Sequence, residues 1–176
     1  MKQRSILWQA AGFAAVTFGG TILHFLYDWT GGSILGAPFS GINESTWEHM
    51  KLMFWPLFLF ALVQRLYFKD QENYWCVKLA EILLGLALIP VLFYTYNGVF
   101  GKSPDWLNIA IFYITALLVF IFEWLVFKRD WLPFKRPLLA FSVICLIGVL
   151  FVVFTFIPPQ IPLFQDPLTG TYGIRI

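Results

Sequence analysis

The amino-acid sequence predicts an all-α, polytopic integral membrane protein with five transmembrane helices. Of its 176 residues, 59% are hydrophobic and 12% are charged, and the mean hydropathy is +0.73. A soluble domain is roughly 45–50% apolar and about 25% charged. This chain therefore has too little polar surface to cover itself in water, and its expected surroundings are membrane lipids. The net charge of +2, without a basic block, excludes nucleic acid as an expected partner.

Five apolar stretches are long enough to cross a membrane, which takes about 20 mostly apolar residues. They predict helices at residues 6–27, 45–68, 75–96, 106–127 and 137–157, all within one domain spanning residues 1–176. The second helix is extended back to Ser45 because the run from Ser45 to Glu48 matches the capping box. In that motif each side chain accepts a hydrogen bond from the other residue's amide. Residues 158–176, rich in proline and glycine, are expected to form an extracytoplasmic tail or lid.

The distribution of lysine and arginine predicts the orientation, because cytoplasmic loops carry the excess of positive charge. If the N-terminus is inside, the inner side receives nine of these residues and the outer side three. The inner set is Lys2, Arg4, Arg65, Lys69, Lys78, Lys128, Arg129, Lys135 and Arg136, and the outer set is Lys51, Lys102 and Arg175. We therefore expect the N-terminus inside and the C-terminus outside.

Ionisable side chains concentrate at the end of the first predicted helix and the start of the second, on the outer side. His24 and Asp28 are four residues apart and share a helix face. Glu44, Glu48 and His49 follow a glycine-rich stretch at residues 30–42, which we expect to dip back into the outer leaflet. Imidazole and carboxylate groups are ligands for zinc, manganese or iron. The pattern predicts a metal site with ligands His24, Asp28 and His49, and with Glu48, assisted by Glu44, as the catalytic base.

A purely structural interpretation competes with this metal site. The spacing is not HExxH, and the same residues would serve as a capped helix end whose acids face water. A ligand or proton site without metal is a third reading. In either of the two binding readings, the remaining pocket residues are expected to be Asn43, Ser45, Lys51, Tyr94, Tyr96, Asn97 and Asp166.

Glu81 and Glu123 form a second group of interest, because each lies within about two turns of the predicted inner interface. One expectation is that both side chains reach toward the nearby lysines and arginines at the membrane surface. The alternative is a proton or cation route that runs inward from the outer site. Intramembrane carboxylates are often functional, which keeps this alternative open.

Two sequence runs carry a family resemblance. The first is His24-Phe25-Leu26-Tyr27-Asp28-Trp29 together with the run from Phe39 to Lys51, which contains Asn43-Glu44-Ser45-Thr46-Trp47-Glu48-His49. The second is the tail from Ile161 to Ile174. The chain resembles a family of small bacterial integral membrane proteins of unknown function. The resemblance implies a multi-pass protein of the bacterial cytoplasmic membrane and brings no activity with it.

Three classes of function follow from these features. The first is a metal-dependent hydrolase acting on a lipid or envelope substrate at the outer leaflet. The second is a small-molecule or ion transporter, or a ligand-binding membrane subunit. Five helices in one chain would then call for a homo-oligomer or a partner membrane subunit to form a symmetric pathway. The third is a structural or regulatory membrane protein without a small ligand.

Overall fold

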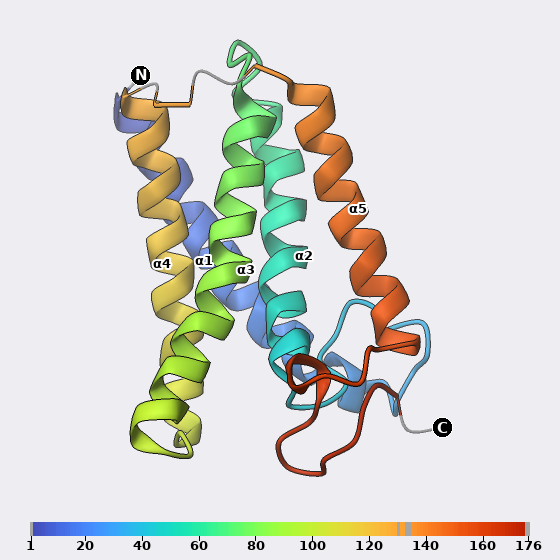
Figure 1. Ribbon diagram of the computed structural model, residues 1–176. Helices are drawn as coiled ribbons and strands as arrows, with labels where there is room; N and C mark the ends of the chain where they lie inside the picture. The colour runs from blue at the N-terminus through green and yellow to red at the C-terminus, as the bar shows by residue number, and fades with distance from the viewer. Residues whose placement is uncertain (1, 130, 133–134, 175–176) are drawn as a thin grey trace.

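The computed structural model describes residues 2–129, 131–132 and 135–174, which form an all-α bundle (Figure 1). The helices are α1 (Lys2–Trp29), α2 (Thr46–Arg65), α3 (Tyr74–Phe100), α4 (Asp105–Arg129), α5 (Pro137–Phe156) and the short 3-10 helix η1 (Pro162–Phe164). The described part of the chain contains no strand and has a single isolated antiparallel bridge, between Gln165 and Tyr172. The predicted fold class is confirmed at this level.

Four of the five α-helices are long and apolar enough to cross a membrane, namely α1, α3, α4 and α5. The fifth, α2, begins with a polar turn that contains Glu48, His49 and Lys51. It ends at Arg65, three residues before the predicted end at residue 68. The chain turns there, with the Arg65 guanidinium donating to the carbonyl of Phe68.

The polar-starting helix α2 is nevertheless the most enclosed helix of the bundle. It packs against α1 and α3 and also contacts α4 and α5. Met53, Phe54 and Leu57 on α2 are at most 1% exposed. They meet apolar side chains from each of the other helices, so that α2 supplies the middle of the core. In Figure 1, α2 accordingly lies between α3 and α5, with α1 crossing behind.

Small residues on α1 let it approach its neighbours closely. A Cβ added at Gly12 would lie 2.3 Å from the ring of Phe120 on α4. One added at Gly20 would lie 3.1 Å from the carbonyl of Leu52 on α2. Close approach of this kind is how helices gain packing energy in lipid, where the surroundings are as apolar as the core.

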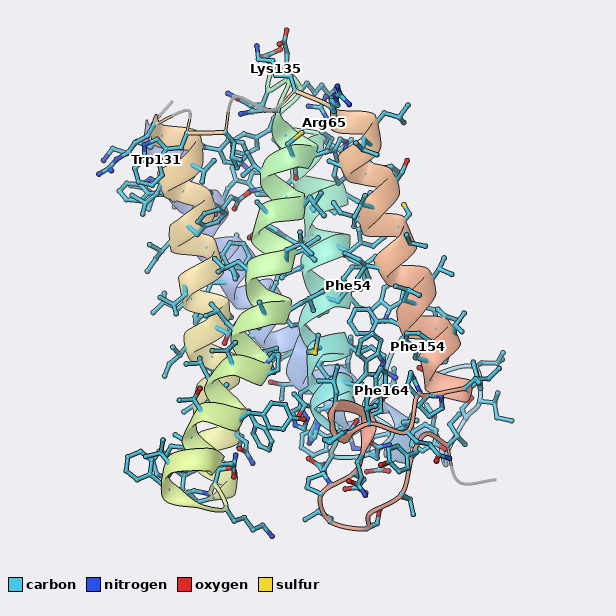
Figure 2. All side chains as sticks on the ribbon, viewed as in Figure 1. Phe54, Arg65, Trp131, Lys135, Phe154 and Phe164 are labelled. Carbon is cyan, nitrogen blue, oxygen red and sulfur yellow. The ribbon has the colours of Figure 1, made fainter. Side chains whose placement is uncertain are left out.

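The loops divide between the two ends of the bundle (Figure 1). The N-terminus, the α2–α3 turn and the α4–α5 link lie at one end, which we call the N-terminal end. The 30–45 loop, the α3–α4 turn and the tail lie at the other, which we call the loop end. Figure 2 shows Arg65 and Lys135 at the N-terminal end, whereas Phe154 and Phe164 lie near the loop end.

Candidate functional site

The first turn of α2 begins at Ser45 as the capping motif predicts, but only half of the capping box forms. The Ser45 hydroxyl accepts from the Glu48 amide at 3.4 Å. The Glu48 carboxylate does not return to the Ser45 amide, which instead donates to the side chain of Asn43 at 2.9 Å. Asn43 thus takes over the role that the motif gives to Glu48, and Glu48 bonds elsewhere.

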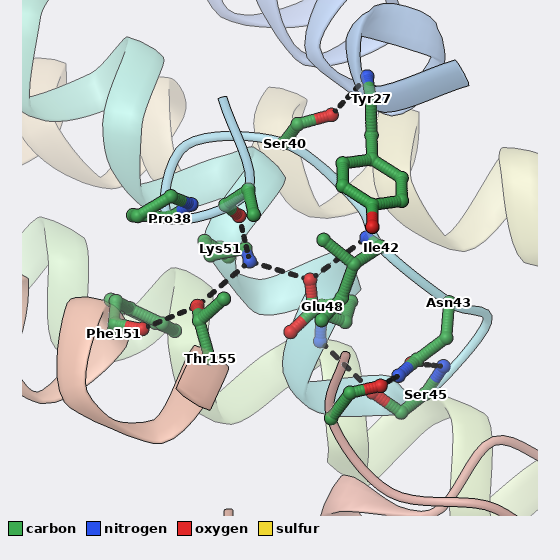
Figure 3. A network of polar contacts seen from close by, with 12 residues as sticks. Tyr27, Pro38, Ser40, Ile42, Asn43, Ser45, Glu48, Lys51, Phe151 and Thr155 are labelled. Atoms are coloured by element: carbon green, nitrogen blue, oxygen red, sulfur yellow. Dashed lines mark hydrogen bonds and ion pairs between the residues drawn. The ribbon is translucent and has the colours of Figure 1, made fainter. Parts of the chain in front are cut away.

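Glu48 is part of a buried ion pair with Lys51 (Figure 3). The ammonium nitrogen lies 2.6 Å from Glu48 Oε2, and the two side chains are 0% and 4% exposed. The same carboxylate oxygen accepts from the Ile42 amide at 3.1 Å. Lys51 also donates to the carbonyl of Ala37 at 2.8 Å and to the Thr155 hydroxyl at 3.1 Å. Burying two charges is tolerated because each is paired and hydrogen-bonded.

These bonds hold the 30–45 loop against α1 and α2. The Ser40 hydroxyl donates to the Leu23 carbonyl at 2.6 Å and accepts from the Tyr27 amide at 2.8 Å. The Trp55 indole, about one turn beyond Lys51, donates to the carbonyl of Pro38 at 2.9 Å. Irregular backbone at membrane depth requires such internal partners. The expected re-entrant loop therefore has the hydrogen bonding that this position would demand.

His24 and His49 approach each other next to this loop, with Glu44 between them. The ring centroids of the two histidines are 5.8 Å apart. Glu44 Oε1 lies 3.8 Å from His24 Nε2, and Glu44 Oε2 lies 3.6 Å from His49 Nε2. His49 Nδ1 lies 2.9 Å from the carbonyl of Ser45, which fixes the ring. His24 on α1 and His49 on α2, two of the three predicted metal ligands, therefore lie close together.

The proposed metal ligands do not form a closed set. Asp28, the third predicted ligand, forms no ion pair with His24 or His49 among the described contacts. No group of three or more His, Cys, Asp and Glu side chains within residues 2–129, 131–132 and 135–174 is arranged to hold a metal ion. The carboxylate that meets both imidazoles is Glu44, which the sequence analysis assigned to catalysis.

A pocket of about 270 Å³ opens beside Glu44, between the 30–45 loop and the tail. It is lined by Tyr27, Ile42, Asn43, Glu44, Asp166, Thr169, Thr171 and Gly173. The Asp166 carboxylate accepts from the Leu168 amide at 2.9 Å and from the Thr169 hydroxyl at 2.6 Å. We call this the outer pocket. Glu44 is 44% exposed, and it is the lining carboxylate that the tail does not engage.

Of the seven predicted pocket residues, only Asn43 and Asp166 line the outer pocket. Ser45 caps α2 and Lys51 is buried with Glu48, as described above. The other three lie on α3. The Tyr94 hydroxyl accepts from Thr46 at 3.4 Å, which joins α3 to the start of α2. Tyr96 packs on the Phe100 ring. Asn97 closes the α3–α4 turn, where its side-chain oxygen accepts from the Ser103 amide at 2.8 Å. None of them lines the outer pocket.

The tail covers the loop end of α2 and α5, as a lid would. Phe164 in η1 is 5% exposed. Its ring lies 4.6 Å from the Trp47 ring and 5.5 Å from the Phe154 ring, measured between centroids. A turn at residues 166–170 is closed by the Gly170 amide donating to the Asp166 carbonyl at 2.8 Å. The aromatic contact anchors the segment that forms one wall of the outer pocket.

Glu81 and Glu123 do not reach the surface; they turn into the bundle and share Lys78. The Lys78 ammonium lies 2.8 Å from Glu81 Oε2 and also pairs with Glu123 Oε1. All three side chains are at most 1% exposed. The expectation that these acids extend to the membrane surface is therefore wrong. We call Lys78, Glu81 and Glu123 the buried triad.

At the N-terminal end, a second cavity of about 380 Å³ is lined by Arg65, Lys69, Gln71, Glu72, Trp75, Lys135 and Pro137. Lys135 lies 2.8 Å from Glu72 Oε2. Its hydrogen bond and its positive charge lower the pKa of the Glu72 carboxyl from its ordinary value. Both side chains are more than 60% exposed, so this is a surface ion pair of small energetic weight.

Sequence reasoning missed Lys78 and Thr155 and misjudged Lys51. Lys78 was counted only as a charge of the inner side, and Lys51 was counted as a charge of the outer side and as a pocket residue, whereas both are buried. The spacing was a signal that could have found them. Glu48 and Lys51, like Lys78 and Glu81, are three residues apart, which places each pair on one helix face. Thr155 gave no comparable signal, because its place beside Lys51 depends on how α5 packs.

Comparison with known proteins bears on the family alone. No curated protein and no solved structure matches this chain. A model of the family of unknown function DUF6512 matches residues 1–174. That match covers the helices, the 30–45 loop, the outer pocket and the buried triad. The chain belongs to the DUF6512 family.

Proposed function

We propose that the protein binds a primary ammonium group in the outer pocket, either on a free amine or on a lipid headgroup. The position of Glu44 carries the proposal. Its carboxylate is half-exposed at the pocket wall, and the other lining carboxylate, Asp166, is engaged by the tail. No lysine or arginine lines this pocket within the described residues. An ammonium needs acceptors, and the hydroxyl, amide and carboxylate oxygens of the lining supply them.

The same geometry argues against the hydrolase that the sequence pattern suggests. A general base must be free to take a proton from water or substrate. Glu48 is enclosed and is bonded to Lys51 and to the Ile42 amide. Glu44 remains as a base, but its two neighbouring imidazoles lack the third ligand of a catalytic zinc site. Ligand binding, the second of the three function classes, is therefore the better-supported reading.

We also propose the placement of the chain in a bacterial cytoplasmic membrane. In this arrangement α2 is the fifth span, and the N-terminus lies inside. The neighbouring helices enclose most of α2, whereas Leu59, Leu62 and Val63 are exposed and would face lipid. The lysines and arginines gathered at the N-terminal end support this orientation. The outer pocket then faces the outer leaflet. Labelling of single cysteines placed at Gly98 and Gln71 with an impermeant maleimide tests it. Reaction from outside at residue 98 alone supports the proposal, and the opposite pattern rejects it.

Calorimetric titration of the full-length protein in detergent with ethanolamine tests the binding proposal. We expect saturable binding that Glu44→Gln abolishes and that Glu72→Gln, the matched change at an exposed acid of the other end, leaves intact. Tetramethylammonium, which cannot donate hydrogen bonds, should bind at least tenfold more weakly. Nanodiscs of phosphatidylethanolamine, compared with phosphatidylglycerol, separate a lipid headgroup from a free amine. Equal binding by the wild type and Glu44→Gln would reject the proposal.

A metal measurement on the same samples distinguishes the competing enzyme class. Elemental analysis of protein purified without chelator should show less than stoichiometric zinc, manganese or iron. About one metal ion per chain, lost in the His24→Ala/His49→Ala double variant, would instead support a metal site at the two imidazoles. Assays for hydrolysis of lipid substrates would then be the next experiment.

A further inference from the structure

The buried triad contains one more acid than base. Lys78 supplies one positive charge, and Glu81 and Glu123 supply two carboxyl groups. With both carboxyls ionised, the triad would carry a net charge of −1 in a region where all three side chains are at most 1% exposed. An uncompensated charge in such surroundings is strongly disfavoured. The triad is neutral when one of the two carboxyls holds a proton.

The groups around the triad stabilise the Lys78 ammonium, but they do not supply a second positive charge for the other carboxylate. The Lys78 nitrogen lies 5.9 Å, 5.8 Å and 5.9 Å from the ring centroids of Phe60, Tyr74 and Phe120. Aromatic faces at this distance attract a cation. Among the described side chains, no second cation pairs with either carboxylate of the triad. The guanidinium of Arg65 lies on the Tyr74 ring, 5.5 Å from its centroid.

The hydrogen bonds around the triad are also incomplete on the acid side. Glu81 Oε1 and Glu123 Oε2 are buried and make no hydrogen bond within the described structure. The nearby Tyr74 hydroxyl is already committed, since it donates to the Ala61 carbonyl at 2.6 Å and to Gln64 Oε1 at 3.1 Å. Buried carboxylate oxygens normally have partners. A proton on one carboxyl removes its charge and leaves a single carboxylate to balance Lys78.

Two titratable groups outside the triad lie next to it. They are Tyr74 on α3, whose ring Lys78 approaches, and Arg65 on α2, which lies on the same ring. No titratable group among the described side chains of α1 and α5 contacts the triad. One ammonium and two carboxyls therefore decide its charge.

We propose that Glu81 and Glu123 form a proton-binding site, in which one proton is shared between them and the second carboxylate balances Lys78. Loading is the reaction of hydronium with one carboxylate to give a carboxylic acid and water. Lys78 lies four residues from the start of α3, and Glu123 six residues from the end of α4. At 1.5 Å per residue these depths are roughly 6 Å and 9 Å from the N-terminal end of the bundle. The site is thus buried but close to one aqueous face.

Infrared spectroscopy of the full-length protein in nanodiscs tests the proposal, because a protonated carboxyl has a C=O stretch separate from that of a carboxylate. At neutral pH the wild type should show one buried carboxylic acid per chain, whose band shifts in deuterated water and disappears as the pH is raised. Glu81→Gln and Glu123→Gln should each abolish this band, because the remaining acid then pairs one-to-one with Lys78. The Glu72→Gln control should keep it.

Removing Lys78 should have the opposite effect on the carboxylic-acid band. Lys78→Met should double the band intensity, because both carboxyls then need a proton to be neutral. If that variant fails to fold, the two glutamine variants still decide the question. Absence of the band in the wild type at neutral pH would overturn the proposal. So would its full persistence in both glutamine variants, which would place the proton on another acid. Neither result depends on the ligand of the outer pocket.

Discussion

Lys51 should be the most costly single charge to remove from this protein. Its ammonium joins three segments, since it bonds to Glu48 on α2, to the carbonyl of Ala37 in the 30–45 loop and to Thr155 on α5. Lys51→Met retains much of the side-chain volume but leaves the Glu48 carboxylate, 3% exposed, without its cation. We expect Glu48→Gln, which leaves the ammonium without its anion, to be costly for the same reason.

The magnitude follows from the burial of the pair. Removing one partner of a buried ion pair costs about 3–5 kcal/mol, because the other charge is left uncompensated. Replacing both partners removes that penalty, and the glutamine can still accept from the Ile42 amide. The Lys51→Met/Glu48→Gln double variant should therefore cost about 2 kcal/mol less than the sum of the two single changes.

Equilibrium unfolding in mixed detergent micelles, followed by tryptophan fluorescence and circular dichroism, measures this cycle. A matched cycle on the exposed pair, with Lys135→Met and Glu72→Gln, should give no measurable coupling. The reasoning would be refuted if either buried single variant cost less than about 1 kcal/mol. It would equally fail if the buried pair behaved additively, since coupling is what distinguishes a desolvated ion pair from two independent polar contacts.

Two further predictions concern packing. Gly12→Ala should destabilise the bundle by about 1–3 kcal/mol, because its Cβ would lie 2.3 Å from an aromatic ring of α4. Gly98→Ala, with no neighbour within 4 Å, should instead stabilise by up to about 1 kcal/mol through helix propensity; unfolding curves that rank the two variants the other way would contradict this. Phe164→Ala removes the anchor of the tail, and we expect hydrogen exchange to rise at residues 158–174 while α3 and α4 stay protected. Equal protection of the tail in both proteins would show that its backbone bonds alone hold it.

The helices could be predicted from the sequence because long apolar runs have few backbone alternatives, and four of them form helices long and apolar enough to cross a membrane. Every backbone amide in a membrane-spanning segment must donate its hydrogen bond within the protein, so a long apolar run predicts a helix. The start of α2 was readable from Ser45 and Asn43, which are helix-capping residues by chemistry. The end at Arg65 was not, because apolar residues continue to Phe68 and give no sign of the local turn in which the Arg65 guanidinium donates to the Phe68 carbonyl.

The site was predicted in its location but not in its pairing. Two residues of the polar run at 43–49, Asn43 and Glu44, line the outer pocket. His24 and His49 lie close to each other beside Glu44 but do not line it. Glu48 was taken for a base because nothing in its own segment shows that the 30–45 loop and α5 close over Lys51. Glu123 on α4 pairs with Lys78 on α3 because the two helices pack against each other. The three-residue spacing marks Glu48 with Lys51 and Lys78 with Glu81 as possible pairs. The burial of these pairs and the addition of Glu123 are properties of the assembled bundle, which local sequence does not encode.

The two buried Lys/Glu pairs therefore have different roles, although their spacing along the helix is the same. Lys51 and Glu48 balance one-to-one, and the loop and α5 supply the remaining hydrogen bonds, so the pair has no vacancy for a further charge. Lys78 balances only one of its two acids, and carboxylate oxygens are left without partners. The second buried carboxylate would be destabilised, because no cation or hydrogen bond compensates its charge. A bound proton removes that charge. Both clusters are buried, so the ratio of acids to bases distinguishes them. Lys51 and Glu48 form a structural ion pair, whereas the buried triad is the candidate for exchanging a proton with the aqueous side.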